Sequence, residues 1–354
     1  MKKIVLTGGG TAGHVTPNMA LLPRLRELGY DIHYIGSYDG IEKKLIEECD
    51  IPYYGISSGK LRRYFDVKNF SDPFKVLKGY SQAIRLLKKL KPDVVFSKGG
   101  FVSVPVILAA KHCKVPSIIH ESDLTPGLAN KLAIPAAQKV CCNFPETLQY
   151  LPKEKAVLTG SPIRRELMNG NRLRALELCH FTANKKVLLV VGGSTGSQLI
   201  NNVVRGLLPE LCKYYQVIHL CGKGNLEPSL NHQEGYAQFE YARNELADFF
   251  ALADLVISRA GANAICEILA LHIPNILIPL SASASRGDQI LNARSFENQG
   301  FSYVLEEEQL SGLILKDAIG HVIENRQMYI DAMKRSKQLN SIETIVELID
   351  SVAR

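Results

Sequence analysis

The sequence predicts an α/β protein made of two doubly wound, Rossmann-like domains that face a central cleft. The 354 residues are too many for one typical core and suit two domains. Short apolar runs alternate with amphipathic segments along the whole chain, and a glycine-rich turn occurs twice, about half a chain apart. This alternation is typical of parallel sheets that carry helices on both faces.

The first half opens with a buried strand, a glycine-rich turn and a helix, and the second half repeats that order from Val190. The predicted strands are Lys3–Thr7, Asp31–Gly36, Asp93–Ser97 and Ser117–His120, then Val187–Val191, Gln216–Cys221, Asp254–Ser258 and Asn275–Pro279. Predicted helices include Thr16–Leu28, Gln198–Cys212 and Asn263–Leu271. We expect one domain over residues 1–163 and a second over residues 164–354. The last helical stretch, roughly Ile323–Val352, is expected to pack back on the first domain.

Composition indicates an ordinary globular protein, with 46% apolar and 22% charged residues. The longest apolar stretch, Phe101–Ala110, falls far short of the roughly 20 residues that span a bilayer, so we expect a cytosolic chain. Eight cysteines without zinc-like spacing predict reduced thiols. Residues 1–164 carry 24 basic and 14 acidic residues (+10), whereas residues 165–354 carry 18 and 21 (−3). A basic half is suited to nucleic acid, anionic lipid or a polyphosphate ligand, or it is simply a basic surface.

The two glycine-rich turns predict phosphate binding. Such a turn lets the backbone approach a ligand, and the helix that follows offers free N–H groups and a positive dipole end. The turn Gly8–Gly13 also satisfies G-x-G-x-x-G, so a dinucleotide dehydrogenase is an alternative. That alternative needs an acidic residue at the end of the second strand, where Asp39 comes late, and it leaves Gly192–Gly196 without a role.

His14 directly follows the first turn, at the carboxyl end of a strand, where doubly wound sheets bind ligands. An imidazole there is suited to removing a proton from a hydroxyl nucleophile. We therefore favour a functional histidine over a merely structural one.

The motifs, taken together and in order, resemble the MurG family, the UDP-N-acetylglucosamine:undecaprenyl-diphosphoryl-muramoylpentapeptide N-acetylglucosaminyltransferases of peptidoglycan synthesis. They cover nearly the whole chain: residues 8–17 (GGGTAGHVTP), 97–103 (SKGGFVS), 120–121 (HE), 126–131 (PGLANK), 160–164 (GSPIR), 192–197 (GGSTGS), 258–267 (SRAGANAICE) and 286–293 (RGDQILNA).

The resemblance implies the GT-B fold, with UDP-sugar held mainly by the second domain and the acceptor by the first. It implies transfer of N-acetylglucosamine, with inversion, to the C4 hydroxyl of the muramoyl-pentapeptide of undecaprenyl-linked lipid I, giving lipid II. No cofactor and no nucleic acid are expected. The enzyme would work at the cytoplasmic face of the cell membrane as a peripheral protein, with cell-wall synthesis proteins as possible partners.

Individual residues carry over from the family motifs. Those expected to contact substrates are Thr11, Ala12 and Gly13 on the sugar and acceptor side, Asn130 and Gln289 at the donor sugar, Arg164 and Ser194 at the nucleotide and phosphates, and Ala242 near the uracil. The acid/base candidates are His14 and Glu121, although Glu121 could equally position a neighbour. Asp288 precedes Gln289 where some members have a second Gln, and the form with Asp resembles the Gram-positive branch.

Leaving-group chemistry can also be argued from the residues. No D-x-D motif is present, so no metal is expected, and helix starts and hydroxyl groups must stabilise the departing UDP. A second helix start follows Gly261, at Ala262, Asn263 and Ala264. Glu267, further along that helix, is placed to accept hydrogen bonds from the ribose hydroxyls. Its alternative role is to complement the helix dipole.

Three further alternatives share the fold. Another GT-B lipid glycosyltransferase would share the membrane surface, and a UDP-N-acetylglucosamine 2-epimerase would need no lipid. A non-catalytic nucleotide sensor would keep the phosphate loops and could lose His14.

The segment Lys60–Lys91 is a candidate membrane surface. It carries ten basic and two acidic residues with interleaved aromatic side chains. We expect Arg62, Arg63, Tyr64 and Phe65 to bind an anionic leaflet, at about 1 kcal/mol per basic residue. From Phe74 onward, apolar residues recur at helical spacing, and this stripe is expected to pack on the sheet.

Overall fold

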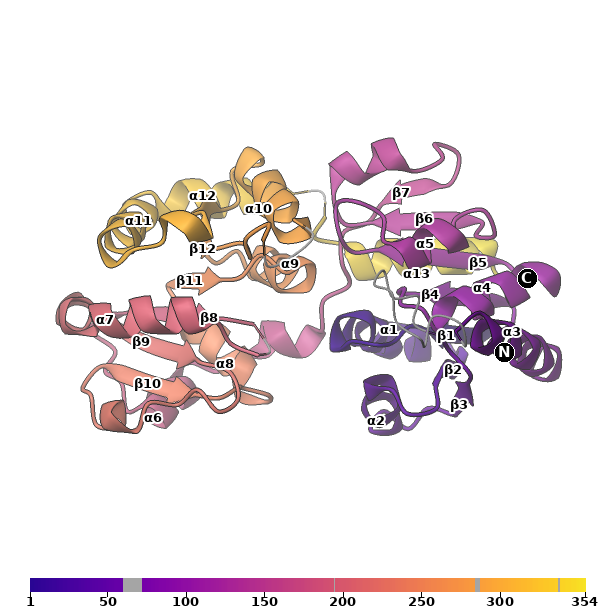
Figure 1. The fold of residues 1–354 in the computed structure, drawn as a ribbon, viewed down its shortest axis with the longest axis horizontal. Helices are drawn as coiled ribbons and strands as arrows, with labels where there is room; N and C mark the ends of the chain where they lie inside the picture. Colours follow the sequence, from indigo (N-terminus) through magenta and orange to yellow (C-terminus); the bar gives the residue numbers. More distant parts are fainter. Residues whose placement is uncertain (60–71, 194, 284–286, 337) are drawn as a thin grey trace. The chain divides into compact units, whose positions relative to one another are not determined.

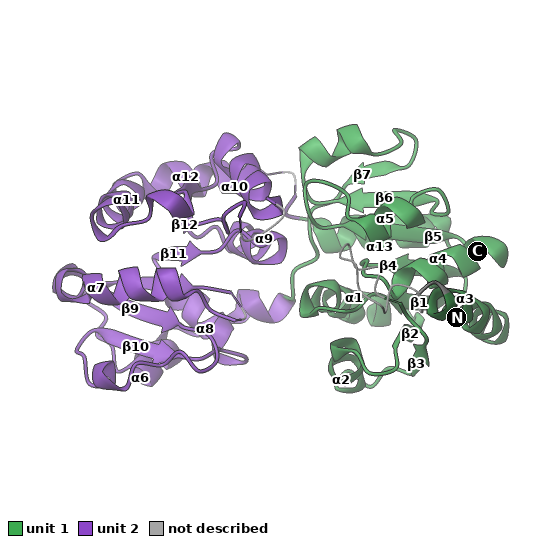
Figure 2. Ribbon diagram, viewed as in Figure 1, with its two compact units in different colours: residues 1–164, 340–354 green, residues 165–339 purple. Residues whose placement is uncertain are grey.

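A computed structural model describes the whole chain except residues 60–71, 194, 284–286 and 337. The chain divides into two compact units, residues 1–164 with 340–354, and residues 165–339 (Figure 2). The first segment of unit 1 ends at Arg164, and the final fifteen residues also lie in unit 1.

Unit 1 contains a seven-stranded parallel sheet in the order β3-β2-β1-β4-β5-β6-β7. Its strands are β1 (Lys3–Thr7), β2 (Asp31–Ser37), β3 (Tyr53–Ile56), β4 (Val94–Ser97), β5 (Ser117–Glu121), β6 (Lys139–Cys142) and β7 (Ala156–Leu158). Its helices are α1 (Thr16–Glu27), α2 (Ile41–Glu47), α3 (Asp72–Leu90), α4 (Ser103–His112), α5 (Leu128–Ala133) and α13 (Ser341–Val352), with the short 3-10 helices η1 (Ala12–His14) and η3 (Pro145–Tyr150) (Figure 1).

Helices cover both faces of this sheet, as the alternation of buried strand residues requires. Val5, Val95 and Ile119 face a core formed with α3, α4 and α5. Their neighbours Ile4, Leu6 and Phe96 face the opposite core, formed with α1, α2 and α13.

The last helix, α13, is fixed to unit 1 by polar contacts as well as by its apolar face. Asp350 accepts hydrogen bonds from Lys2 Nζ (2.6 Å) and Tyr30 OH (2.9 Å), and Glu343 accepts from Arg24 Nε (2.9 Å). The expected single stretch 323–352 is in fact broken between α12 and α13, and only α13 belongs to unit 1.

Unit 2 has a six-stranded parallel sheet in the order β10-β9-β8-β11-β12-β13, which repeats the strand order of unit 1. Its strands are β8 (Lys186–Val191), β9 (Tyr215–Leu220), β10 (Tyr236–Phe239), β11 (Leu255–Ser258), β12 (Asn275–Leu277) and β13 (Tyr303–Val304). Its helices are α6 (Arg172–Cys179), α7 (Gln198–Tyr214), α8 (Glu245–Leu252), α9 (Ala262–Leu271), α10 (Asp288–Asn298), α11 (Gly312–Glu324) and α12 (Arg326–Lys334), and the 3-10 helices are η4 (Arg165–Asn169), η5 (Pro228–Leu230) and η6 (Glu307–Gln309).

All eight strands predicted from sequence overlap with observed strands.

The apolar stripe of α3 was predicted to pack on the sheet, and only part of it does so. Tyr80, Ile84 and Leu87 pack against the unit 1 core as expected. Phe74 and Leu77 do not, because 75% and 63% of their surfaces remain exposed. In the part of the chain that the structure describes, no helix is long and apolar enough to cross a bilayer.

Candidate functional site

Each sheet has one topological switch point, where the strand order reverses, and ligands of doubly wound sheets bind at the carboxyl ends of the strands there. In unit 1 the switch lies between β1 and β4, and in unit 2 between β8 and β11. The two glycine-rich turns found in the sequence follow β1 (Gly8–Gly10) and β8 (Gly192–Gly193), and further glycines of the motifs follow β4 (Gly99–Gly100) and β11 (Gly261). Each unit therefore has a loop site of the same design.

In unit 1 the loops after β1 and β4 are in contact. Gly9 N–H donates to the Gly99 carbonyl at 3.3 Å. Gly100 has a φ of +83°, and a Cβ there would collide with the Gly9 carbonyl. Only glycine adopts this positive φ readily and also has no Cβ to collide, so the two loops pack closely and form one rigid platform.

His14 ends the 3-10 helix η1 on this platform. Its Nδ1 lies 3.1 Å from the Gly9 carbonyl oxygen and 3.1 Å from Thr11 Oγ1. Burial, and secondly the charge of Lys98, lowers the pKa of His14 to about 4, so the imidazole is neutral at pH 7. Thr11 and Ala12 are exposed and Gly13 is half-buried, which leaves this loop accessible to a substrate.

Glu121 and Asn130 lie close to His14. The Glu121 carboxylate accepts from the backbone N–H groups of residues 122, 123 and 127 (2.8, 3.0 and 2.9 Å) and from Asn130 Nδ2 (2.8 Å). Burial raises the pKa of Glu121, while these bonds oppose the shift. A Cβ on Gly99 would lie 3.5 Å from His14 Cδ2 and 3.6 Å from Asn130 Oδ1, so both side chains flank the same glycine. Asn130 Oδ1 is buried and has no hydrogen-bond partner among the described residues.

The structure adds a buried basic group that sequence reasoning missed. Lys98 follows β4, and its Nζ bonds to His120 Nδ1 at 2.8 Å and to Ser122 Oγ at 2.5 Å. His120 Nε2 lies 2.9 Å from the Gly160 carbonyl and must donate to it, which leaves Nδ1 as the acceptor for Lys98. Burial and Lys98 both lower the pKa of His120. Lys98 lies within the SKGGFVS motif, but its burial could not be seen there.

In unit 2 the turn after β8 leads directly into α7. Ser197 caps α7 by accepting from Ile200 N–H at 3.4 Å. Gly196 has a φ of +76°, and a Cβ there would collide with the Cys221 carbonyl. The predicted phosphate contact Ser194 lies outside the described residues. Because Gly196 lies against Cys221, the turn that leads into α7 packs closely on the end of β9.

The other predicted contacts of unit 2 lie on neighbouring loops and helix starts. Ala262, Asn263 and Ala264 form the first turn of α9, and Glu267 is half-buried further along that helix. Asp288 and Gln289 open α10, and Gln289 Oε1 accepts from Leu280 N–H at 3.1 Å. Ala242 lies in the loop after β10, and Arg164 ends the first part of unit 1.

Arg259 ties the unit 2 loops together, which sequence reasoning also missed. Its guanidinium donates to Ser197 Oγ (2.8 Å), to the carbonyls of Ile278 (3.2 Å) and Pro279 (3.3 Å), and to Glu307. Although burial opposes ionisation, the bond from Arg259 lowers the pKa of Glu307. One side chain thus joins the segments that follow β8, β11, β12 and β13.

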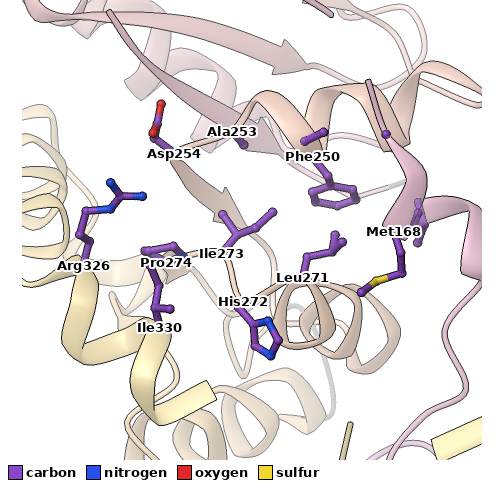
Figure 3. Close-up of a pocket in the computed structure, with 13 residues that line it drawn as sticks. Met168, Phe250, Ala253, Asp254, Leu271, His272, Ile273, Pro274, Arg326 and Ile330 are labelled. Carbon is purple, nitrogen blue, oxygen red and sulfur yellow. The ribbon is translucent and has the colours of Figure 1, made fainter. Parts of the chain in front are cut away.

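A cavity of about 240 Å³ lies elsewhere in unit 2 (Figure 3). Met168 and Phe250 lie across it from Arg326 and Ile330. Asp254 and Pro274 in its wall directly precede β11 and β12, so the cavity is at the amino edge of the sheet. The glycine loops are at the opposite edge, and we do not assign substrate binding to this cavity.

Within the described residues, no group of three or more His, Cys, Asp or Glu side chains is arranged to hold a metal ion.

Comparison with known proteins identifies the family. Residues 4–142 match the glycosyltransferase family 28 N-terminal domain, and residues 187–349 match the family 28 C-terminal domain. The chain is 68% identical to the UDP-N-acetylglucosamine--N-acetylmuramyl-(pentapeptide) pyrophosphoryl-undecaprenol N-acetylglucosamine transferase of Lachnoclostridium phytofermentans, over 99% of each chain. It is 64% identical to the protein of the same name from Lachnospira eligens, again over 99% of each.

A solved structure agrees with these relatives. The crystal structure of MurG from Acinetobacter baumannii superposes with a TM-score of 0.77 at 26% identity, covering 99% of this chain and 100% of that one. The resemblance and the GT-B fold expected from the motifs are thereby confirmed, and the chain belongs to glycosyltransferase family 28, as a member of the MurG family.

Proposed function

We propose that the protein transfers N-acetylglucosamine from UDP-N-acetylglucosamine to the C4 hydroxyl of the muramoyl-pentapeptide of lipid I, with inversion, to give lipid II. The names of its relatives state the donor, the undecaprenol-linked acceptor and the sugar that is moved. The acceptor oxygen forms a bond to the anomeric carbon as the bond from that carbon to the UDP oxygen breaks. The hydroxyl proton goes to a base, and the electron pair leaves with UDP.

The observation that carries this proposal is the geometry of His14. Its Nδ1 is engaged by the Gly9 carbonyl, which leaves Nε2 to accept the proton. Glu121 is less suited to that role, because four hydrogen bonds already occupy its carboxylate. We assign proton removal to His14, and we assign to Glu121 the positioning of Asn130 and of the loop 122–127.

Unit 2 is suited to hold UDP. The N-termini of α7 and α9 offer N–H groups and positive dipole ends to a diphosphate. We assign phosphate contacts to Ser194 and Arg164, the ribose to Glu267, the uracil to the Ala242 backbone, and the donor sugar to Asn130, Asp288 and Gln289. Thr11, Ala12 and Gly13 line the sugar and acceptor side.

Turnover of UDP-N-acetylglucosamine with a short-chain lipid I analogue tests the reaction directly. In parallel, UDP should raise the melting temperature, because a ligand that binds only the native state stabilises it by RT ln(1 + [L]/Kd), whereas NAD should not. Stabilisation by NAD without UDP would overturn the proposal in favour of a dehydrogenase. Product formation without a lipid acceptor would favour an epimerase.

We also propose that unit 1 binds the anionic cytoplasmic surface of the membrane peripherally. The predicted residues Arg62, Arg63, Tyr64 and Phe65 lie outside the described residues. Support comes from the start of α3, where exposed Phe74 and Leu77 stand beside exposed Lys75 and Lys78. Such a mixture of apolar and basic side chains is typical of interfacial helices. Proteins of cell-wall synthesis would meet the enzyme on that surface.

Co-sedimentation with phosphatidylglycerol vesicles at low and high salt tests this surface. Phe74→Ser/Leu77→Ser should weaken binding at least about tenfold, because each buried apolar side chain is worth roughly 1.5–3 kcal/mol. Leu173→Ser/Leu313→Ser, which makes the same kind of change at two exposed apolar positions of unit 2, is the matched control and should bind like the wild type. Binding that ignores salt and lipid charge, or that survives the Phe74/Leu77 change, would place the membrane surface elsewhere.

A further inference from the structure

A buried carboxylate lies beneath the glycine loop of unit 1. Glu42, on α2, has no exposed surface, and none of the ion pairs among the described residues includes it. Glycines make room for it: a Cβ on Gly9 would lie 2.5 Å from its carboxyl carbon, and a Cβ on Gly40 would collide with its oxygens. Burying a charge is costly, so its hydrogen bonds indicate what it does.

The carboxylate is held by three donors from two loops. Oε1 accepts from Ser37 N–H at 3.1 Å and from Ser37 Oγ at 2.5 Å, at the end of β2. Oε2 accepts from Gly10 N–H at 3.1 Å, in the loop after β1. Bonds to an ionised acceptor are roughly twice as strong as neutral ones, so Glu42 anchors the glycine loop.

The peptide unit between Gly9 and Gly10 connects Glu42 to His14. In a trans peptide the N–H and the C=O point in opposite directions. On one side, Gly10 N–H donates to Glu42. On the other side, the Gly9 carbonyl lies 3.1 Å from His14 Nδ1. The three groups therefore form a continuous chain of carboxylate, peptide and imidazole.

This chain fixes the tautomer of His14. The Gly9 carbonyl can only accept, so Nδ1 must carry the hydrogen. Thr11 Oγ1, also 3.1 Å from Nδ1, can accept from the same N–H. The lone pair of the neutral ring is therefore on Nε2.

We propose that Glu42 is a positioning residue for His14, which acts through the Gly9–Gly10 peptide to hold the imidazole with Nδ1 protonated and Nε2 ready to accept the acceptor proton. The inference rests on the proposed role of His14 as the base. A carboxylate bonded directly to histidine does the same in hydrolase triads, and here one peptide unit is interposed. Hydrogen bonds in such a chain polarise one another, so the Glu42 charge strengthens the Gly9 carbonyl as an acceptor.

The proton movements balance without Glu42 changing its own charge. As the acceptor oxygen bonds to the anomeric carbon, its proton moves to Nε2 and the imidazole becomes a cation. The Nδ1–H bond to the Gly9 carbonyl then stabilises that cation, and the negative charge of Glu42 adds to this effect. Glu42 raises the pKa of His14 and so opposes burial and Lys98, the two influences that lower it.

The first test determines the tautomer of His14 in the full-length protein. Long-range ¹⁵N–¹H spectra of protein labelled in histidine, assigned with His14→Ala, should show Nδ1 protonated in the wild type at pH 7. The Nε2-protonated form in the wild type would overturn the inference, whether or not any Glu42 variant folds.

The second test compares Glu42→Gln with Glu48→Gln, which makes the same charge change at an exposed position just after α2. We expect Glu42→Gln to lower kcat roughly tenfold, far less than the ~10⁴-fold seen when a directly bonded carboxylate is altered. KM for the donor should stay unchanged, and the acid limb of kcat should move to lower pH. Glu48→Gln should match the wild type in each measurement.

The two proposals fail separately. Normal kcat in His14→Ala would remove the base role, and the spectra would still decide how the ring is held. Loss of activity in His14→Ala, together with an unchanged tautomer, kcat and pH profile in a folded Glu42→Gln, would overturn the role of Glu42 alone.

Discussion

The residue that follows the strand beyond the switch point is basic in both units, Lys98 after β4 and Arg259 after β11. Both sit in the same backbone position, because Lys98 N–H donates to the last residue of β1 (3.0 Å) and Arg259 N–H to the last residue of β8 (3.3 Å). Their side chains then act differently. Lys98 bonds to a histidine and a serine hydroxyl, whereas Arg259 is paired with Glu307 and joins backbone carbonyls.

This difference suits one strand–turn–helix design to the two tasks that we propose for the two units. The charge of Lys98 lowers the pKa of His14 and of His120, and Glu42 opposes it at His14, the base that we propose for unit 1. The charge of Arg259 is balanced by Glu307, so it serves as a geometric tie that keeps the loops around the helix N-termini in place. A planar guanidinium with several fixed donors is suited to such a tie, and a compact ammonium to an electrostatic effect.

The largest effect should come from His14 itself. His14→Ala should lower kcat by roughly 10²–10⁴-fold, because a positioned general base contributes about that much. UDP binding, measured by calorimetry, should be unchanged, since His14 lies in unit 1 and the proposed UDP site lies in unit 2. A near-normal kcat would return His14 to a structural role and remove the contrast between the units.

The next effect concerns Arg259, whose hydrogen bonds join the loops of unit 2. Arg259→Ala should destabilise the fold by about 3–5 kcal/mol, because it leaves the partly buried Glu307 carboxylate without its partner. UDP affinity should also fall, because Ser197 and the loop after β12 lose their anchor. Thermal unfolding and calorimetry with UDP measure the two effects.

A double variant separates stability from positioning. Arg259→Leu/Glu307→Leu should recover much of the stability, because an apolar pair can replace a buried ion pair. It should not recover UDP affinity. Full recovery of both would mean that Arg259 stabilises the fold in general and has no specific effect on the loops that we propose to bind phosphate.

A smaller effect is expected in the pH dependence of unit 1. The base must be neutral, so kcat should fall with acid as pH approaches the His14 pKa of about 4. Lys98→Gln removes a positive charge that lowers this pKa. The midpoint of the acid limb of the kcat–pH profile should then rise from about 4 to a pH between 4 and 6.5. At pH 5 the variant should therefore lose more of its pH 7 activity than the wild type does.

Lys114→Gln, at an exposed lysine of unit 1, is the matched control and should leave the acid limb unchanged. An unchanged limb in Lys98→Gln would show that the charge of Lys98 does not lower the pKa of His14. The two basic residues would then differ in geometry but not in electrostatic role.

The sequence was sufficient for the parts of this design that depend on local pattern. The central strands carry continuous apolar runs, and the glycine turns follow them directly, so the positions of both loops could be predicted. The edge strands β3 and β13 could not, because Tyr53–Ile56 includes a glycine and is mostly half-buried, and Tyr303–Val304 is only two residues long.

The residues that distinguish the two sites were missed for a different reason. Glu42 and Lys98 are charged, and nothing local indicates that a charged side chain will be buried. Glu307 lies 48 residues from Arg259, and their pairing depends on β11 and β13 ending at the same edge of the sheet. Such contacts between distant segments leave no periodic pattern in one sequence.

The smallest effect is expected from a chelator, which should leave the rate of sugar transfer unchanged. The departing UDP needs its negative charge stabilised, and a D-x-D motif that would hold a divalent cation is absent from the sequence. Unit 2 instead offers the N-termini of α7 and α9, each with backbone N–H groups and the positive end of a helix dipole. Transfer in excess EDTA should therefore proceed at the same rate as with magnesium added back. Loss of activity in EDTA, restored by magnesium or manganese, would mean that the ends of α7 and α9 are insufficient, and that the site in unit 2 requires a cation which its backbone does not replace.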